Sequence, residues 1–189
     1  MSHAVLTQDA IDLASFISNP YKFGKGGDEK VFEPEGVDEM ISHINAAWSI
    51  DRHEMAQGSI GQAPDGSTAV GIPVWPKTDL KGRKILEDDN LIVELFPSKY
   101  GFLEHTYAYR FTAKPDGRVF AFGGDGTYSE GLAAAAKNAD ILFVEGITRK
   151  NVKFATWGGD TDFDRLSVLN EMIDEGIRNI LLAQDGDLY

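Results

Sequence analysis

The second half of this chain alternates between short apolar segments and segments of helical character. Apolar stretches of strand length are separated by helix-forming stretches in the order 118–122, 129–137, 141–144, 163–175 and 180–183. The first helix is opened by TYSE at 127–130, which has the spacing of a capping box. Strands that alternate with helices pack as stacked layers of sheet and helix. The pattern therefore predicts an α/β fold.

The middle of the chain, before residue 118, consists mainly of predicted strands. Apolar or alternating segments lie at 69–75, 91–96 and 107–112, with turn residues between them. The sequence KPDG at 114–117 separates the last of these from the strand at 118–122. Because Pro fixes φ and Gly accepts positive φ, we expect a hairpin at this point.

The first third combines helices with one short strand. A helix around 9–18 is expected to end before Asn19-Pro20, and a strand at 30–32 is closed by the turn residues PEG. Apolar residues at helical spacing then predict one amphipathic helix from 37 to 52. Residues 58–66 are rich in Gly, Gln, Ser and Pro, which indicates a surface loop.

Composition narrows the class of protein. The 189 residues, 42% of them hydrophobic and 25% charged, fit one globular domain over 1–189. The 18 Lys and Arg against 30 Asp and Glu give a net charge of -12, which repels phosphate backbones, so no nucleic-acid partner is expected. No apolar run approaches the ~20 residues that span a bilayer, and the first residues carry no secretory signal. We therefore expect a cytoplasmic protein that does not bind membranes. The chain has no cysteine, which excludes disulfides, thiolate zinc sites and Cys nucleophiles.

Several segments carry a resemblance that extends in order over nearly the whole chain. They are VFEPEG at 31–36, YAYRF at 107–111, VFAFGGDG at 119–126, KNADILFVE at 137–145 and ILLAQD at 180–185. Together they resemble the metallo-β-lactamase superfamily, and specifically its ribonuclease Z-like and arylsulfatase-like members. The resemblance implies a partial αββα sandwich, an α/β architecture in which this chain lacks the usual N-terminal strands.

The zinc ligands of that superfamily are mostly missing from the corresponding positions. Where the superfamily carries HxHxDH, residues 3–9 read HAVLTQD. Tyr100 stands near a histidine position, Val144 replaces the histidine of the HE pair, and Gln184 replaces the terminal histidine. Asp125, which matches the bridging aspartate, is the only ligand position clearly retained.

The histidine count supports the same conclusion without any alignment. The chain contains four histidines, His3, His43, His53 and His105. His43 and His53 fall on or just after the predicted amphipathic helix, away from strand ends. The remaining two are too few for a two-zinc site of this kind. We therefore expect no cofactor; zinc or another divalent metal is expected only if the site has been rebuilt.

His105 and Asp125 are the candidate catalytic residues. His105 follows Glu104, and a His–carboxylate pair could act as a general base. The competing interpretation is a surface contact, because neighbours in a strand point to opposite faces. Asp125 could contact a metal or substrate, or its oxygens could accept backbone hydrogen bonds in the Gly-rich turn.

Further candidates concern ligand binding. Arg110, Tyr100 and Gln184 are the candidate ligand-binding residues. Arg110 could hold an anion through two hydrogen bonds, or it could pair with a carboxylate at the edge of the core. A set of carboxylates could also meet at strand ends and suit Mg²⁺, Mn²⁺ or Ca²⁺, or simply form a solvated acidic rim. These are Asp125, Glu145, Asp185 and Asp187.

Two functions remain open at this point. The first is a non-catalytic binding or interaction module that reuses the fold. Open edges at 30–32 and 91–96 would then be covered by a homo-oligomer or a partner protein, unless residues 69–84 fold back over the gap. A small-molecule ligand is a further candidate partner. The alternative is a metal-dependent hydrolase of the same superfamily with a rebuilt site, acting on an ester, lactone or phosphodiester.

Overall fold

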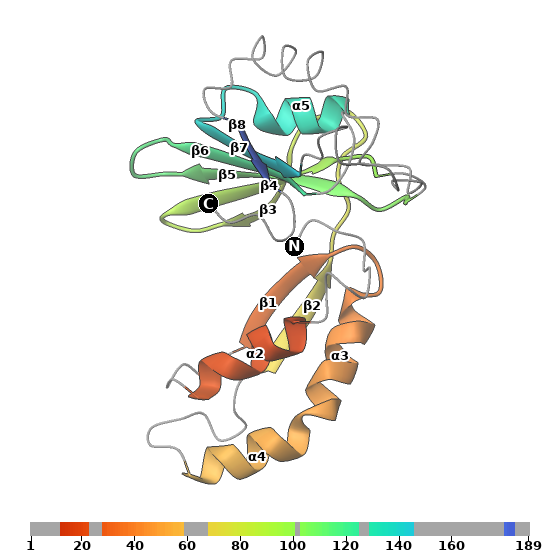
Figure 1. Ribbon diagram of the computed structural model, residues 1–189, viewed down its shortest axis with the longest axis vertical. Helices are drawn as coiled ribbons and strands as arrows, with labels where there is room; N and C mark the ends of the chain where they lie inside the picture. Colours follow the sequence, from red (N-terminus) through yellow and green to blue (C-terminus); the bar gives the residue numbers. More distant parts are fainter. Residues whose placement is uncertain are drawn as a thin grey trace. The chain divides into compact units, whose positions relative to one another are not determined.

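The computed structural model in Figure 1 describes residues 12–22, 28–58, 68–100, 103–124, 129–145 and 180–183. These residues fall into two compact units, which divide between Val74 and Trp75. We call them the N-terminal unit and the sheet unit. The expectation of a single domain over 1–189 stays a prediction. None of the described helices is long and apolar enough to cross a membrane.

The N-terminal unit places helices beside a two-stranded parallel sheet. Strands β1 and β2 pair in register from Asp28 opposite Thr68 to Glu33 opposite Pro73. Apolar residues of the helices and of β2 form its core, with Ile17 and Val37 fully buried. The elements are α2 (Leu13–Lys22), β1 (Asp28–Glu33), α3 (Val37–Ala47), α4 (Ser49–Gly58) and β2 (Thr68–Pro73).

Two predicted helix boundaries in this unit are wrong. Helix α2 continues through Asn19-Pro20, because proline costs a helix one hydrogen bond and some strain without stopping it at every position. The single helix expected from 37 to 52 is two helices that break at Trp48, which leaves helical geometry with φ −102 and ψ 11. The Ser49 hydroxyl donates to the carbonyl of Ala46 at 2.8 Å and so occupies one of the last acceptors of α3.

Strand β2 is held against α3 by a side chain and by close backbone contact. The Asn45 amide donates to the carbonyl of Ala69 at 2.7 Å and accepts from the Ala69 amide at 3.2 Å. Two residues along the strand, a Cβ on Gly71 would lie 2.5 Å from the carbonyl oxygen of Val37. The side-chain amide of Asn45 therefore satisfies both backbone groups of Ala69.

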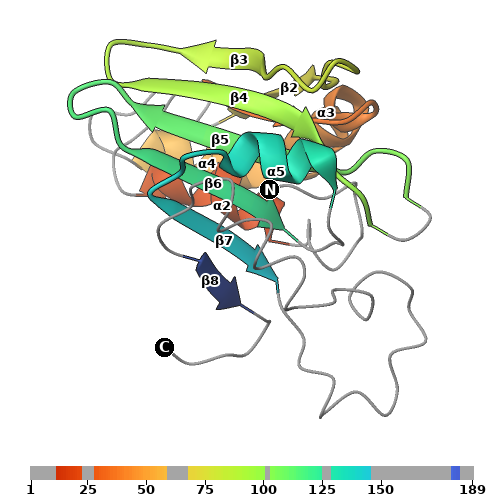
Figure 2. The same cartoon turned by 90° about the horizontal axis from the view of Figure 1, so that it is seen from above.

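The sheet unit is built on a six-stranded sheet in the order β3-β4-β5-β6-β7-β8. Figure 2 shows this order with α5 lying across the sheet. Strands β3 to β6 are antiparallel neighbours, whereas β6, β7 and β8 run parallel. The elements are β3 (Arg83–Glu87), β4 (Leu91–Pro97), β5 (Tyr107–Ala113), β6 (Val119–Gly124), α5 (Glu130–Ala136), β7 (Ile141–Glu145) and β8 (Ile180–Ala183).

Most predicted strands of this unit are confirmed, including the hairpin between β5 and β6. Gly117 has φ +71, and its amide donates to the Ala113 carbonyl at 2.8 Å. The expected open edge at 91–96 is wrong, because β4 lies between β5 and the unpredicted strand β3. The region 69–84 contributes β2 to one sheet and the start of β3 to the other. The helix expected at 163–175 lies outside the described residues.

Helix α5 covers one face of the sheet. Its alanines and Leu132 pack with Ala121, Leu142 and other buried residues of β4 to β7. The helix begins at Ser129, whose hydroxyl accepts from the Leu132 amide at 3.1 Å. The predicted capping box is therefore wrong in detail, because Ser129 and not Thr127 is the N-cap. Helix α5 and strand β4 are in such close contact that a Cβ on Gly131 would lie 1.9 Å from the Pro97 carbonyl oxygen.

Candidate functional site

One edge of the six-stranded sheet collects the ends of five strands. The parallel strands β6, β7 and β8 end there at Gly124, Glu145 and Ala183. Strand β4 ends and β5 begins at the same edge, where Pro97 pairs with Tyr107. The carboxyl ends of strands in open α/β sheets are where ligands bind. We call this the carboxyl edge.

Two of the predicted residues lie in the segment between β4 and β5, at the carboxyl edge. Tyr100 is half-buried, and its carbonyl accepts from the Leu103 amide at 2.9 Å in the turn after β4. His105 is exposed just before β5, next to the buried Thr106. The carbonyl of Thr106 accepts from the Ser98 amide at 2.8 Å, which fixes the backbone beside His105.

Two other candidates follow β6 and β8 in the sequence. Asp125 comes directly after Gly124, and Gln184 comes directly after Ala183. Both lie outside the described residues, as do Asp185 and Asp187. Glu145 is the last residue of β7 and pairs with Ala183. Their roles in catalysis, ligand binding or metal binding stay predictions.

Arg110 lies away from this edge. Its Nη1 donates to the carbonyl oxygens of Ala135 at 2.8 Å and Lys137 at 2.7 Å, at the C-terminal end of α5. Its Nε lies 4.0 Å from Oε2 of Glu94, the cross-strand neighbour on β4. Burial lowers the pKa of Arg110, and the charge of Glu94 opposes this shift. The guanidinium therefore fastens the helix to the sheet, and its role in ligand binding stays a prediction.

The histidines expected on helices are confirmed there. His43 is exposed on α3, with Nε2 at 3.8 Å from a carboxylate oxygen of Glu39. His53 is exposed on α4 and shares a 2.9 Å hydrogen bond with Gln57. Both belong to the N-terminal unit. His105 is thus the histidine that the described residues place at the carboxyl edge.

Val144 occupies an apolar place under α5. It is 2% exposed and belongs to the core that α5 forms with the sheet. A Cβ on Gly123 would lie 2.8 Å from its Cγ1, so the neighbouring strand approaches it closely. Within the described ranges, no three His, Asp or Glu side chains are grouped so that they could hold a metal ion.

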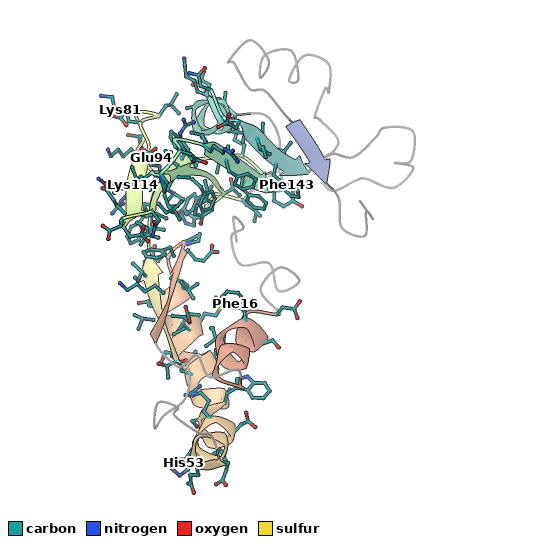
Figure 3. All side chains as sticks on the ribbon, turned by 90° about the vertical axis from the view of Figure 1, so that its left-hand side faces the viewer. Phe16, His53, Lys81, Glu94, Lys114 and Phe143 are labelled. Carbon is teal, nitrogen blue, oxygen red and sulfur yellow. The ribbon has the colours of Figure 1, made fainter. Side chains whose placement is uncertain are left out.

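The face of the sheet opposite α5 carries an aromatic patch that sequence reasoning did not identify. Phe111 pairs with Phe120 across β5 and β6, with ring centroids 5.8 Å apart. Phe122 pairs with Phe143 across β6 and β7, with centroids 5.4 Å apart. Figure 3 labels Phe143 on the sheet unit. Ile141, the partner of Phe120, is 36% exposed, and Phe120 is 37% exposed. Apolar residues at every second position of 107–111 and 120–122 carried this signal in the sequence.

Comparison with known proteins identifies the fold. No family model and no curated protein matches the chain. Human tRNase Z, short form (ELAC1), is similar with a TM-score of 0.59 and 13% identity, over 93% of this chain and 71% of that one. The metallo-beta-lactamase fold protein YhfI from Bacillus subtilis is similar with a TM-score of 0.60 and 13% identity. This second match covers 96% of the chain, which spans 62% of YhfI. The protein has the metallo-β-lactamase fold, in the form of a partial α/β sandwich.

Proposed function

We propose that this protein is a non-catalytic interaction module that reuses the metallo-β-lactamase fold without its dinuclear zinc site. The observation that carries the proposal is the aromatic patch formed by Phe111, Phe120, Phe122, Ile141 and Phe143. Phe120 and Ile141 are exposed and the other three are half-buried, and contiguous apolar surface that is open to solvent is typical of a protein–protein contact. The partner that we propose is a second copy of the chain.

Charge does not oppose a second copy on this patch. The chain carries a net charge of -12, so two copies repel each other over most approaches. On this face of β5, β6 and β7, the five residues of the patch carry no charge, and neither does Tyr109, which pairs with Phe122. Like charges are therefore not brought together when two patches meet. A two-fold axis would place the same patch on both sides of the contact.

The histidines and Val144 support the absence of zinc chemistry. His43 and His53 are on helix surfaces of the N-terminal unit. Val144, at the position where the resemblance implies a histidine, contributes a methyl group to the core. A dinuclear zinc site draws on several imidazoles, and the carboxamide of Gln184 is a poor substitute for one. We accordingly propose that no cofactor is needed.

Sedimentation velocity of two variants tests the interaction. We expect the wild type at low micromolar concentration to sediment above the 20.7 kDa of one chain. Phe120→Glu should sediment as a monomer, because two buried carboxylates would face an apolar partner. Ile50→Glu is the matched control, since Ile50 is 77% exposed on α4 and the charge change is identical.

Two results would contradict the self-association. One is a wild type that stays monomeric at every concentration. The other is a Phe120→Glu variant that associates as the wild type does. Thermal unfolding of the same samples separates a lost contact from a lost fold, because a folded monomer unfolds cooperatively.

The alternative is a metal-dependent hydrolase with a rebuilt site at the carboxyl edge. It is favoured by the convergence of five strand ends there and by the likeness to human tRNase Z. Hydrolysis of simple esters, lactones and phosphodiesters would be assayed with Mg²⁺, Mn²⁺ or Zn²⁺ and with chelator. Metal-dependent turnover that Asp125→Asn abolishes, and that His43→Gln leaves unchanged, would establish this function in place of the first.

A further inference from the structure

Arg52 is a buried cation in the N-terminal unit. It lies on α4 and is 8% exposed. Its Nη2 donates to the carbonyl oxygen of Asn45 at 2.7 Å. Its Nε and Nη1 are buried and make no hydrogen bond within the described part of the chain. One nitrogen of the guanidinium is therefore bound to α3, and the N–H groups of the other two nitrogens have no acceptor among the described residues.

The bond to Asn45 offsets only part of the cost of burying this charge. Asn45 is in the last turn of α3, where unsatisfied carbonyls carry roughly half an elementary negative charge. A guanidinium presents five N–H donors in a plane, and it cannot lose its proton in a protein. A buried cation without a counter-charge is strongly destabilising. An acceptor with a full negative charge would stabilise this buried guanidinium.

We infer that Arg52 is the centre of an oxyanion-binding site in the N-terminal unit. The ligand class is a carboxylate or a phosphate, because both offer the paired oxygens that match the donors of a guanidinium. The site lies in the N-terminal unit, whereas the carboxyl edge lies in the sheet unit. The inference does not depend on the proposed self-association, which uses residues of β5 to β7.

The site is connected to the small parallel sheet through one residue. Asn45 accepts from Arg52 with its backbone carbonyl and holds both backbone groups of Ala69 with its side chain. An anion that fixes Arg52 thus also fixes the end of α3 from which β2 is held. Anion binding is expected to stabilise this unit against unfolding, as any ligand of the folded state does.

Thermal unfolding and calorimetry with inorganic phosphate and with acetate test the inference. At constant ionic strength, we expect either anion to raise the Tm of the wild type above its value in chloride. Titration calorimetry should give about one anion per chain, with the Kd at least tenfold weaker in Arg52→Met. Arg118→Met, which removes an arginine that is 80% exposed in the sheet unit, should bind as the wild type does. A rise in Tm and binding with acetate alone identify a carboxylate ligand, and the same result with phosphate alone identifies a phosphate.

A wild type that responds to neither anion would overturn the inference. So would a folded Arg52→Met variant that binds either anion as tightly as the wild type, because the guanidinium would then not be the group that binds it. If Arg52→Met does not fold, the calorimetric stoichiometry of the wild type decides alone.

Discussion

The guanidinium of Arg110 on β5 donates to the carbonyl of Ala135 at 2.8 Å, although 25 residues separate the two in the sequence. The same Nη1 reaches the carbonyl of Lys137, so a strand residue caps the end of helix α5. A cation at a helix C-terminus also interacts favourably with the helix dipole. Arg110 thus joins the two layers of the sheet unit.

Removing this cap should destabilise the protein. Arg110→Met leaves carbonyls of the last turn of α5 without their charged donor, and we expect a loss of about 2–3 kcal/mol in the free energy of unfolding. Arg110→Lys should recover part of it. Urea unfolding measures the change. Arg118→Met is the control, because its exposed ion pair with Asp116 should contribute no more than about 1 kcal/mol. Equal effects of the two methionine variants would refute the structural role of Arg110.

Gly131 should resist a substitution that ordinarily strengthens helices. Replacing Gly by Ala inside a helix gains about 1 kcal/mol where space allows. At Gly131 the new Cβ would lie 1.9 Å from the carbonyl oxygen of Pro97, so α5 must move off the sheet. We expect Gly131→Ala to lose about 3 kcal/mol or more. Ala134→Gly on the same helix should lose only about 1 kcal/mol. If chemical unfolding shows Gly131→Ala to be as stable as the wild type, α5 does not pack against Pro97 as closely as described.

The surface carboxylate of Glu87 should titrate far below its usual range. Hydrogen bonds from Lys114 and Lys84 lower its pKa from 4.5 to about 2. Because the folded pKa is depressed, its contribution to stability is present above pH 4.5 and is lost as the pH falls toward 2. An NMR titration of the Glu87 carboxyl measures the shift. Lys114→Met should raise the pKa, whereas Lys81→Met, which removes a partner of Asp79, should leave it unchanged. A wild-type pKa near 4.5 would contradict the ion pairs.

Replacing the side-chain nitrogen of Asn45 by an oxygen should destabilise the N-terminal unit. Asn45→Asp keeps an acceptor for the Ala69 amide but loses the donor to the Ala69 carbonyl. We expect it to destabilise the N-terminal unit at least as much as Asn45→Ala, by about 1–3 kcal/mol, because a carboxylate then faces a carbonyl oxygen. Hydrogen exchange of the Ala69 amide provides a local readout. Unchanged protection of that amide in Asn45→Ala would show that β2 does not depend on this side chain.

Much of the sheet could be predicted because its strands follow simple rules. The predicted strand at 180–183 has the bounds of β8, and the hairpin before β6 follows from Pro and Gly at fixed turn positions. Strand β3 was missed because charged residues, Arg83, Lys84 and Glu87, flank its two apolar ones. Such charges suit an edge strand and weaken the alternation that reveals a strand.

Contacts to backbone atoms explain most of what the sequence could not predict. The acceptors of Arg110 and Arg52 are carbonyl oxygens, which every residue possesses and no side chain identifies. Thr127 and Ser129 are both good N-caps, so composition cannot choose between them. At the candidate site, Tyr100 was a candidate because it stands near a histidine position of the resemblance, and His105 because it follows Glu104. The sequence could not predict that the guanidinium of Arg110 donates to carbonyl oxygens at the end of α5.

Metal content tests the central proposal most directly. The protein would be purified without chelator from zinc-supplemented medium and analysed by elemental mass spectrometry, with a zinc-binding protein purified in parallel as the control. The proposal that the fold has lost its dinuclear site predicts well under one zinc per chain, for the wild type and for Asp125→Asn alike. One or two zinc ions per wild-type chain, reduced in Asp125→Asn, would contradict it and would favour the hydrolase.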